Sequence, residues 1–244
     1  MLESARLKVE RAEHHIRDVK RQFAAFVKKH PHRLRILPNP QTGKIDIKID
    51  AGKEPPDSIA LTVGDAIHNL RVALDHMTWE VIGRDGGTQN RYLKLPTGDS
   101  RVSFEATIKG IKTPSESLLG MFRSLEVFPG GKGSSLYDLH LMDNADKHTV
   151  LNPVVQFTKV RLVIRNPDGS AFATFDNAAV RGSPNFIGGI APGQWVEVDD
   201  HTKTTPDIFF REVEGAPLKP IIPTLAQHAK LVSETLDLVA DALR

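Results

Sequence analysis

Two stretches of the sequence gather side chains that can move protons, hold phosphate or ligate a metal ion. They are Gly64–Trp79 (GDAIHNLRVALDHMTW) and Leu136–His148 (LYDLHLMDNADKH). Histidine can exchange a proton near neutral pH, the arginine fork fits an oxyanion, and imidazoles with carboxylates suit zinc, iron or manganese. We therefore expect these two stretches to hold the functional site.

Both stretches are predicted to be helices whose polar side chains share one face. At about 100° per residue, the first helix has an apolar face that runs from Ile59 to Val81. Its opposite face gathers six polar residues, which are Asp65, His68, Asn69, Arg71, Asp75 and His76. The second helix carries a polar stripe and a histidine in its last turn; these residues are His140, Asp143, Asn144, Lys147 and His148. The end of that helix suits Lys147 and His148, because the helix dipole favours cations there.

The residues alone leave four interpretations open. They could form an acid–base site acting on phosphodiesters, a ligand or partner site without chemistry, or a polar contact that fixes how the helices pack. They could also form the site of a metal-dependent hydrolase, built from the aspartates and from His68, His76, His140 and His148. However, His68 and His76 lie eight residues apart, about 12 Å along a helix, so one ion cannot take both. We therefore expect no metal and no cofactor.

The composition is typical of a soluble globular protein. The chain has 244 residues, of which 40% are hydrophobic and 25% are charged, and it has no cysteine. This length fits one elaborated domain or two small ones. The missing cysteines exclude disulfides, thiolate metal sites and a cysteine nucleophile. The sequence has no apolar run long enough for a membrane helix and no apolar signal-peptide core, so we expect a cytoplasmic protein with no membrane partner.

The beginning of the chain is basic, although the net charge of the whole chain is only +2. The first 35 residues hold ten Lys or Arg residues and four acidic residues. A basic helix can attract the phosphates of a nucleic acid, and the candidates for such contacts are Arg11, Arg17, Lys20 and Arg21. The competing interpretation is a solvated helix face.

Helices at both ends and in the middle of the chain must position these residues. Apolar residues three and four apart predict long helices at 1–30, 57–83, 134–151 and 222–244. A small hairpin is predicted within 33–50, and strands rich in Val, Phe and Ile are predicted within 153–215. The predicted fold class is α+β: a four-helix-type bundle over 1–152, an inserted small antiparallel β module at 153–215, and a C-terminal helix within 216–244 that returns to the bundle.

Two short helices and a glycine-rich segment are predicted in the middle of the chain. The helices span about 104–111 and 115–127. The segment FPGGKGSS at 128–135 lacks the complete spacing of a phosphate-binding loop, and its glycines predict a flexible linker.

The segment Arg71-Val72-Ala73-Leu74-Asp75-His76 has the form Arg, four residues, His, on a long bundle helix. It resembles the motif of the HEPN superfamily of helical-bundle nucleases. The chain also resembles a group of bacterial proteins of unknown function that combine a GDAxHNLRxALDH helix with a later DNxDKH segment. The resemblance covers these two helices and says little about the β module.

The HEPN resemblance implies a metal-independent endoribonuclease or an RNA-binding protein, of the kind found among toxins and phage-defence factors. His76 would be the general acid or base, and Arg71 would stabilise charge on the phosphate. Seven residues of the two helices would support them: His68, Asn69, Asp75, Asp143, Asn144, Lys147 and His148. The resemblance also implies a homodimer, with RNA as the substrate or partner.

Overall fold

A computed structural model describes residues 1–30, 33–39, 44–50, 53–148, 153–180, 190–198, 206–210 and 219–243. The contacts of the chain divide it into two compact units. The helical unit consists of residues 1–20, 60–151 and 222–244, and the β unit consists of residues 21–59 and 152–221. The chain thus has the predicted α+β class, with several helices and a small antiparallel β module.

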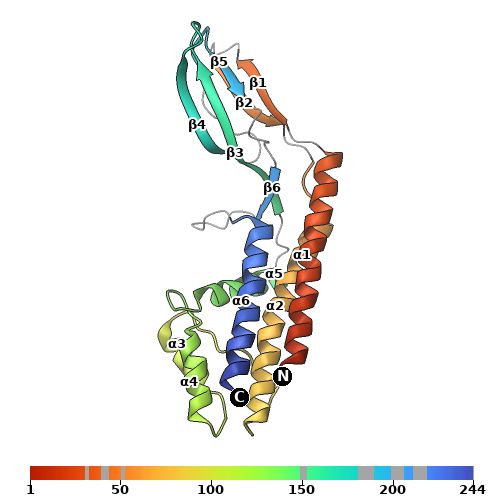
Figure 1. Cartoon of the computed structure of the whole chain (residues 1–244), viewed down its shortest axis with the longest axis vertical. Helices are drawn as coiled ribbons and strands as arrows, with labels where there is room; N and C mark the ends of the chain where they lie inside the picture. Colours follow the sequence, from red (N-terminus) through yellow and green to blue (C-terminus); the bar gives the residue numbers. More distant parts are fainter. Residues whose placement is uncertain are drawn as a thin grey trace. The chain divides into compact units, whose positions relative to one another are not determined.

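Three long helices form the frame of the helical unit (Figure 1). They are α1 (Glu3–Lys29), α2 (Asp57–Arg84) and α6 (Ile221–Ala242), close to the predicted bounds. α1 contacts α6 through an ion pair of 2.7 Å between Arg6 and Asp237, so the two ends of the chain lie near each other. Within the part of the chain that the structure describes, no helix is both long and apolar enough to cross a lipid bilayer.

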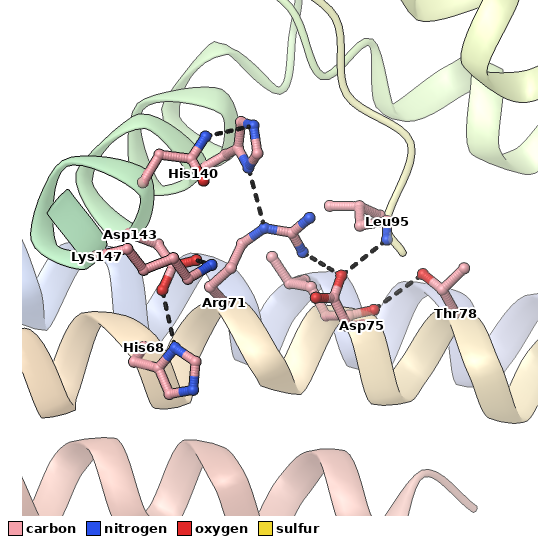
Figure 2. Close-up of polar contacts among 10 residues, drawn as sticks. His68, Arg71, Asp75, Thr78, Leu95, His140, Asp143 and Lys147 are labelled. Carbon is pink, nitrogen blue, oxygen red and sulfur yellow. Dashed lines mark hydrogen bonds and ion pairs between the residues drawn. The ribbon is translucent and has the colours of Figure 1, made fainter. Parts of the chain in front are cut away.

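The second helix is buried over a wider arc than its sequence pattern predicts. The predicted apolar face is buried, and a second row beside it, Ala60, Ile67, Leu74 and Ile82, is buried as well. Helix α5 (Ser134–His148) lies across α2 on the side of Arg71 (Figure 2), and in the segment after α2 the Gly87 N–H donates to the Ile82 carbonyl of this row. Arg71, which the sequence placed on the polar face opposite the apolar one, shares this arc and is buried.

Two short helices lie between α2 and α5. They are α3 (Arg101–Lys109) and α4 (Glu116–Leu125). α3 begins three residues before its predicted start because Ser100 forms a capping box with Ser103, which satisfies backbone N–H groups of the first turn. Ser115 caps α4 in the same way through the Leu118 N–H.

The glycine-rich segment before α5 is a compact turn, so the prediction of a flexible linker was wrong. Val127 and Phe128 anchor it in the core, and the Gly133 N–H donates to the Glu126 carbonyl at 3.2 Å. A Cβ atom at Gly133 would collide with the Leu125 carbonyl, which explains the glycine at this position. The turn therefore fixes where α5 begins.

The β unit contains a two-stranded and a four-stranded antiparallel sheet among its described residues. β1 (Arg33–Asn39) pairs with β2 (Lys44–Asp50) as the predicted hairpin. β3 (Pro153–Arg165) is the centre of the larger sheet. It pairs with β4 (Ala171–Val180) along one edge, and with β5 (Trp195–Val198) and β6 (Pro206–Phe210) along the other.

The predicted bundle covered residues 1–152, whereas the contacts group residues 21–59 with the β unit. The hairpin was expected to belong to the helical bundle, but its contacts group it with the strands of the β unit. The predicted helix end at residue 151 and the predicted boundary at 215–216 lie outside the described residues.

Candidate functional site

The polar residues of α2 fall on two separate stripes of the helix. Asp65, Asn69 and His76 lie on the side of α1, whereas His68, Arg71 and Asp75 lie on the side of α5 and of the segment after α2. His76 is five positions after Arg71 in the sequence, which places the two side chains about 140° apart around the helix. Arg71 and His76 therefore take part in different sites.

A buried network of polar side chains centres on Arg71, which is 3% exposed. Its guanidinium forms an ion pair with Asp75 one turn along α2, and its Nε donates to His140 Nδ1 of α5 at 3.4 Å. Asp75 also accepts the Leu95 backbone N–H at 2.9 Å (Figure 2). A buried charge is stable only when it is paired, so the Arg71 guanidinium depends on these partners. Because the partners come from α2, α5 and the Leu95 segment, the network holds these three parts together.

His140 is the neutral acceptor of this network. Desolvation by burial holds the pKa of His140 below its usual value, and the positive charges of Arg71 and Lys147 act in the same direction. Asp143 and Asp75 oppose that shift. A neutral ring can accept from Arg71 at Nδ1, while the side-chain amide of Asn144 lies 3.0 Å from Nε2.

A second cluster joins the same two helices around Asp143. This carboxylate is 2% exposed, and it accepts from His68 Nδ1 at 2.9 Å and from Lys147 Nζ at 2.5 Å. His68 and Lys147 are half exposed, so the buried carboxylate is held by an imidazole and by an ammonium group that both reach solvent (Figure 2). The two stretches that the sequence singled out thus contact each other through these side chains.

The other polar stripe of α2 lies against α1. Ser4 Oγ is 2.7 Å from His76 Nδ1, and Lys8 Nζ donates to Asn69 Oδ1 at 3.5 Å. Farther along α1, burial lowers the pKa of His15, and the positive charge of Arg11 lowers it further. The negative charge of Asp65 on α2 acts in the opposite direction. Through the contact with Ser4, α1 holds the Nδ1 atom of His76.

A cleft of about 730 Å³ opens beside His76. Its walls come from the start of α1, the last turns of α2 and the segment after α2. Besides His76 and Asp75, the lining residues that can act on a ligand are Trp79, Arg84, Gln89 and Arg91. Arg84, Gln89 and Arg91 carry no signal in the sequence, because loop and helix-end residues follow no periodic pattern.

The charges of the cleft leave one cation available. Arg84 pairs with Glu80 at 2.7 Å. Arg91 lies over the Tyr92 ring, with 4.8 Å between the guanidinium carbon and the ring centroid, and no carboxylate among the described residues pairs with it. An anionic ligand would therefore meet the Arg91 guanidinium.

The remaining candidates lie outside the cleft. Arg11, Arg17, Lys20 and Arg21 are exposed along α1, where Arg17 approaches Glu13 at 4.0 Å. His148 is exposed at the end of α5. Arg71 does not line the cleft, but its partner Asp75 does, so Asp75 is the link between the buried network and the cleft.

The histidines expected for the alternative metal site are separated. His68 contacts Asp143, His140 contacts Arg71, and His76 contacts Ser4. Among the described residues, no three His, Asp or Glu side chains come together as a metal-ligand set. Comparison with known proteins found no matching protein-family model, curated protein or solved structure. The geometry of the cleft therefore carries the functional argument.

Proposed function

We propose that the helical unit binds RNA in the cleft and cleaves it without a metal ion. The observation that carries this proposal is the combination of His76, an exposed Trp79 and Arg91 around one cleft. An imidazole, an aromatic ring and an arginine without a carboxylate partner are suited to the ribose hydroxyl, the base and the phosphate of a nucleotide.

His76 is the proposed general base. With Nδ1–H donating to Ser4 Oγ, the lone pair of the ring lies on Nε2, which can accept the proton of a ribose 2′-hydroxyl. The 2′-oxygen then forms a bond to phosphorus, the bond from phosphorus to the 5′-oxygen breaks, and the leaving oxygen takes a proton from water. The products are a 2′,3′-cyclic phosphate and a 5′-hydroxyl end.

Arg91 takes the phosphate-binding role that the HEPN resemblance assigns to Arg71. Arg91 lines the cleft, whereas Arg71 is buried and engaged with Asp75 and His140. We assign Arg71 a positioning role, exerted through Asp75. The homodimer and a role in phage defence or as a toxin stay predictions, and sedimentation of the purified protein tests the first.

The test compares wild type, His76→Asn and Arg91→Gln on mixed RNA in the presence of EDTA. We expect cleavage to 2′,3′-cyclic phosphate ends by wild type, and a loss of about 100-fold or more in His76→Asn. His14→Asn is the matched control, because His14 is an exposed histidine of α1 that pairs with Asp18. Equal cleavage by wild type and His76→Asn, or no cleavage by any variant, refutes the proposed reaction.

A second candidate is an RNA-binding protein that does not cleave. The lining of the cleft favours this candidate, because His76 is the single histidine among the described residues that line it. Phosphodiester transfer benefits from an acid as well as a base. RNA binding that depends on Arg91 and Trp79, without cleavage, would select this candidate.

A further inference from the structure

Gln89 lines the cleft, and the proposed reaction does not use its side chain. Its side-chain Nε2 donates to the Trp79 backbone carbonyl at 2.8 Å. A primary amide has two N–H donors and a carbonyl acceptor, so one N–H and the oxygen Oε1 are left beside the exposed Trp79 ring. No described residue accepts that N–H or donates to Oε1.

The backbone around Gln89 holds this amide in place. The Gly87 N–H donates to the Ile82 carbonyl at 2.9 Å, and the Thr88 N–H donates to the Lys112 carbonyl at 2.8 Å. A side chain at Gly83 would overlap the Gln89 amide, so the glycine leaves the space that the amide occupies. The bond to Trp79 also fixes the orientation of the amide, because a carbonyl can only receive an N–H.

This fixed amide has a defined match among the RNA bases. Adenine places an amino donor next to a ring-nitrogen acceptor, and the 4-amino group and N3 of cytosine do the same. Such an edge pairs with Oε1 and the remaining N–H of Gln89. Guanine and uracil place a carbonyl oxygen where adenine and cytosine have the amino group, and that oxygen would face Oε1.

Trp79 supplies the surface on which such a base lies. Its side chain is 41% exposed and lines the same cleft as Gln89. Stacking on an aromatic ring accepts any base, so the ring gives affinity and the amide gives selectivity. Arg91 is available for the neighbouring phosphate.

We propose that the cleft selects an unpaired base with an amino edge, adenine or cytosine, by stacking it on Trp79 and pairing it with Gln89. This inference rests on the proposed function for the identity of the ligand as RNA. It adds the base preference of the site, and it is testable by binding alone.

The chain offers a direct probe of this contact. It has two tryptophans, Trp79 and Trp195, so Trp195→Phe leaves Trp79 as the single tryptophan, whose fluorescence is excited selectively over that of the tyrosines. The ligands are hexamers of 2′-O-methyl uridine in which one central base is adenine, cytosine, guanine or uracil. A 2′-O-methyl group cannot be deprotonated as a nucleophile, so binding is measured without cleavage.

In the Trp195→Phe protein, we expect the adenine and cytosine hexamers to quench Trp79 and to bind about tenfold tighter than the other two. Gln89→Ala should bind all four hexamers with similar affinity, because the exposed Trp79 ring remains. Gln227→Ala is the matched control, since Gln227 is an exposed glutamine of α6 outside the cleft. It should keep the preference.

Four similar affinities in the unmutated cleft, or a preference that persists in Gln89→Ala, would overturn the inference. A failure of every hexamer to bind overturns it as well, while cleavage of natural RNA in EDTA would then still support the proposed reaction. The opposite result, a base preference without any cleavage, supports the inference and refutes the proposed reaction.

Discussion

The buried ion pair between Arg71 and Asp75 predicts an asymmetry between its two members. Arg71 is 3% exposed, whereas the side chain of Asp75 is 24% exposed. Asp75→Asn keeps an oxygen for the Leu95 N–H but leaves the guanidinium buried beside a neutral His140. Arg71→Met removes the buried charge and leaves a carboxylate that water can reach from the cleft.

Removing one partner of a buried pair costs about 3–5 kcal/mol, because the other charge stays uncompensated. The partial exposure of Asp75 places Asp75→Asn near the lower end, at about 3 kcal/mol. At roughly 2–4 °C per kcal/mol for a chain of this size, the melting temperature should fall by about 6–12 °C. Arg71→Met should cost about 1–2 kcal/mol, since it loses hydrogen bonds but retains packing volume.

Urea unfolding at pH 7.5, followed by far-UV circular dichroism, measures both variants and the double variant Arg71→Met/Asp75→Asn. We expect the double variant to be more stable than Asp75→Asn alone, because the uncompensated charge is gone. If Asp75→Asn costs no more than Arg71→Met, or if the double variant costs the sum of the two, the buried charge does not dominate and the reasoning fails.

Two further predictions concern stability. Burial lowers the folded-state pKa of His140 and His15, so the folded state binds fewer protons than the unfolded chain below pH 6.5. The stability that these neutral histidines allow is fully present above that pH and is lost as the pH falls. The melting temperatures at pH 7.5 and pH 5.5 should therefore differ less in His140→Gln than in wild type. An equal difference in the two proteins would contradict this prediction. Gly64→Ala should destabilise the protein, because its Cβ would collide with the Asp146 carboxylate of α5, whereas Gly120→Ala, in open space on α4, should stabilise it by about 0.5–1 kcal/mol. Urea midpoints that rise in both glycine variants would show that α5 does not approach α2 closely.

The elements of the fold could be predicted because their cues are local. Spacings of three and four predicted the long helices, and segments rich in Val, Phe and Ile predicted the strands of the β module. The i,i+4 pairs of Asp143 with Lys147 and of Asn144 with His140 likewise follow from helix geometry.

The arrangement around α2 could not be predicted, because it depends on what packs against the helix. The sequence predicted a single polar face opposite the apolar face, because the pattern along one helix does not show how many neighbours pack against it. In the structure α1 takes one polar stripe and α5 takes the other, which separates His76 from Arg71. Gln89 and Arg91 reach the cleft from the segment after α2, whose position depends on long-range contacts.

This separation changes how a loss of activity in Arg71 variants is to be interpreted. Arg71 holds Asp75, and Asp75 both lines the cleft and accepts the Leu95 N–H. Loss of cleavage in an Arg71 variant can therefore come from a displaced cleft wall and does not show that Arg71 touches phosphate. When a guanidinium that binds phosphate directly is removed, the affinity for RNA depends less steeply on salt concentration. Arg91→Gln should reduce that salt dependence, while Arg71→Met should leave it unchanged even where cleavage falls.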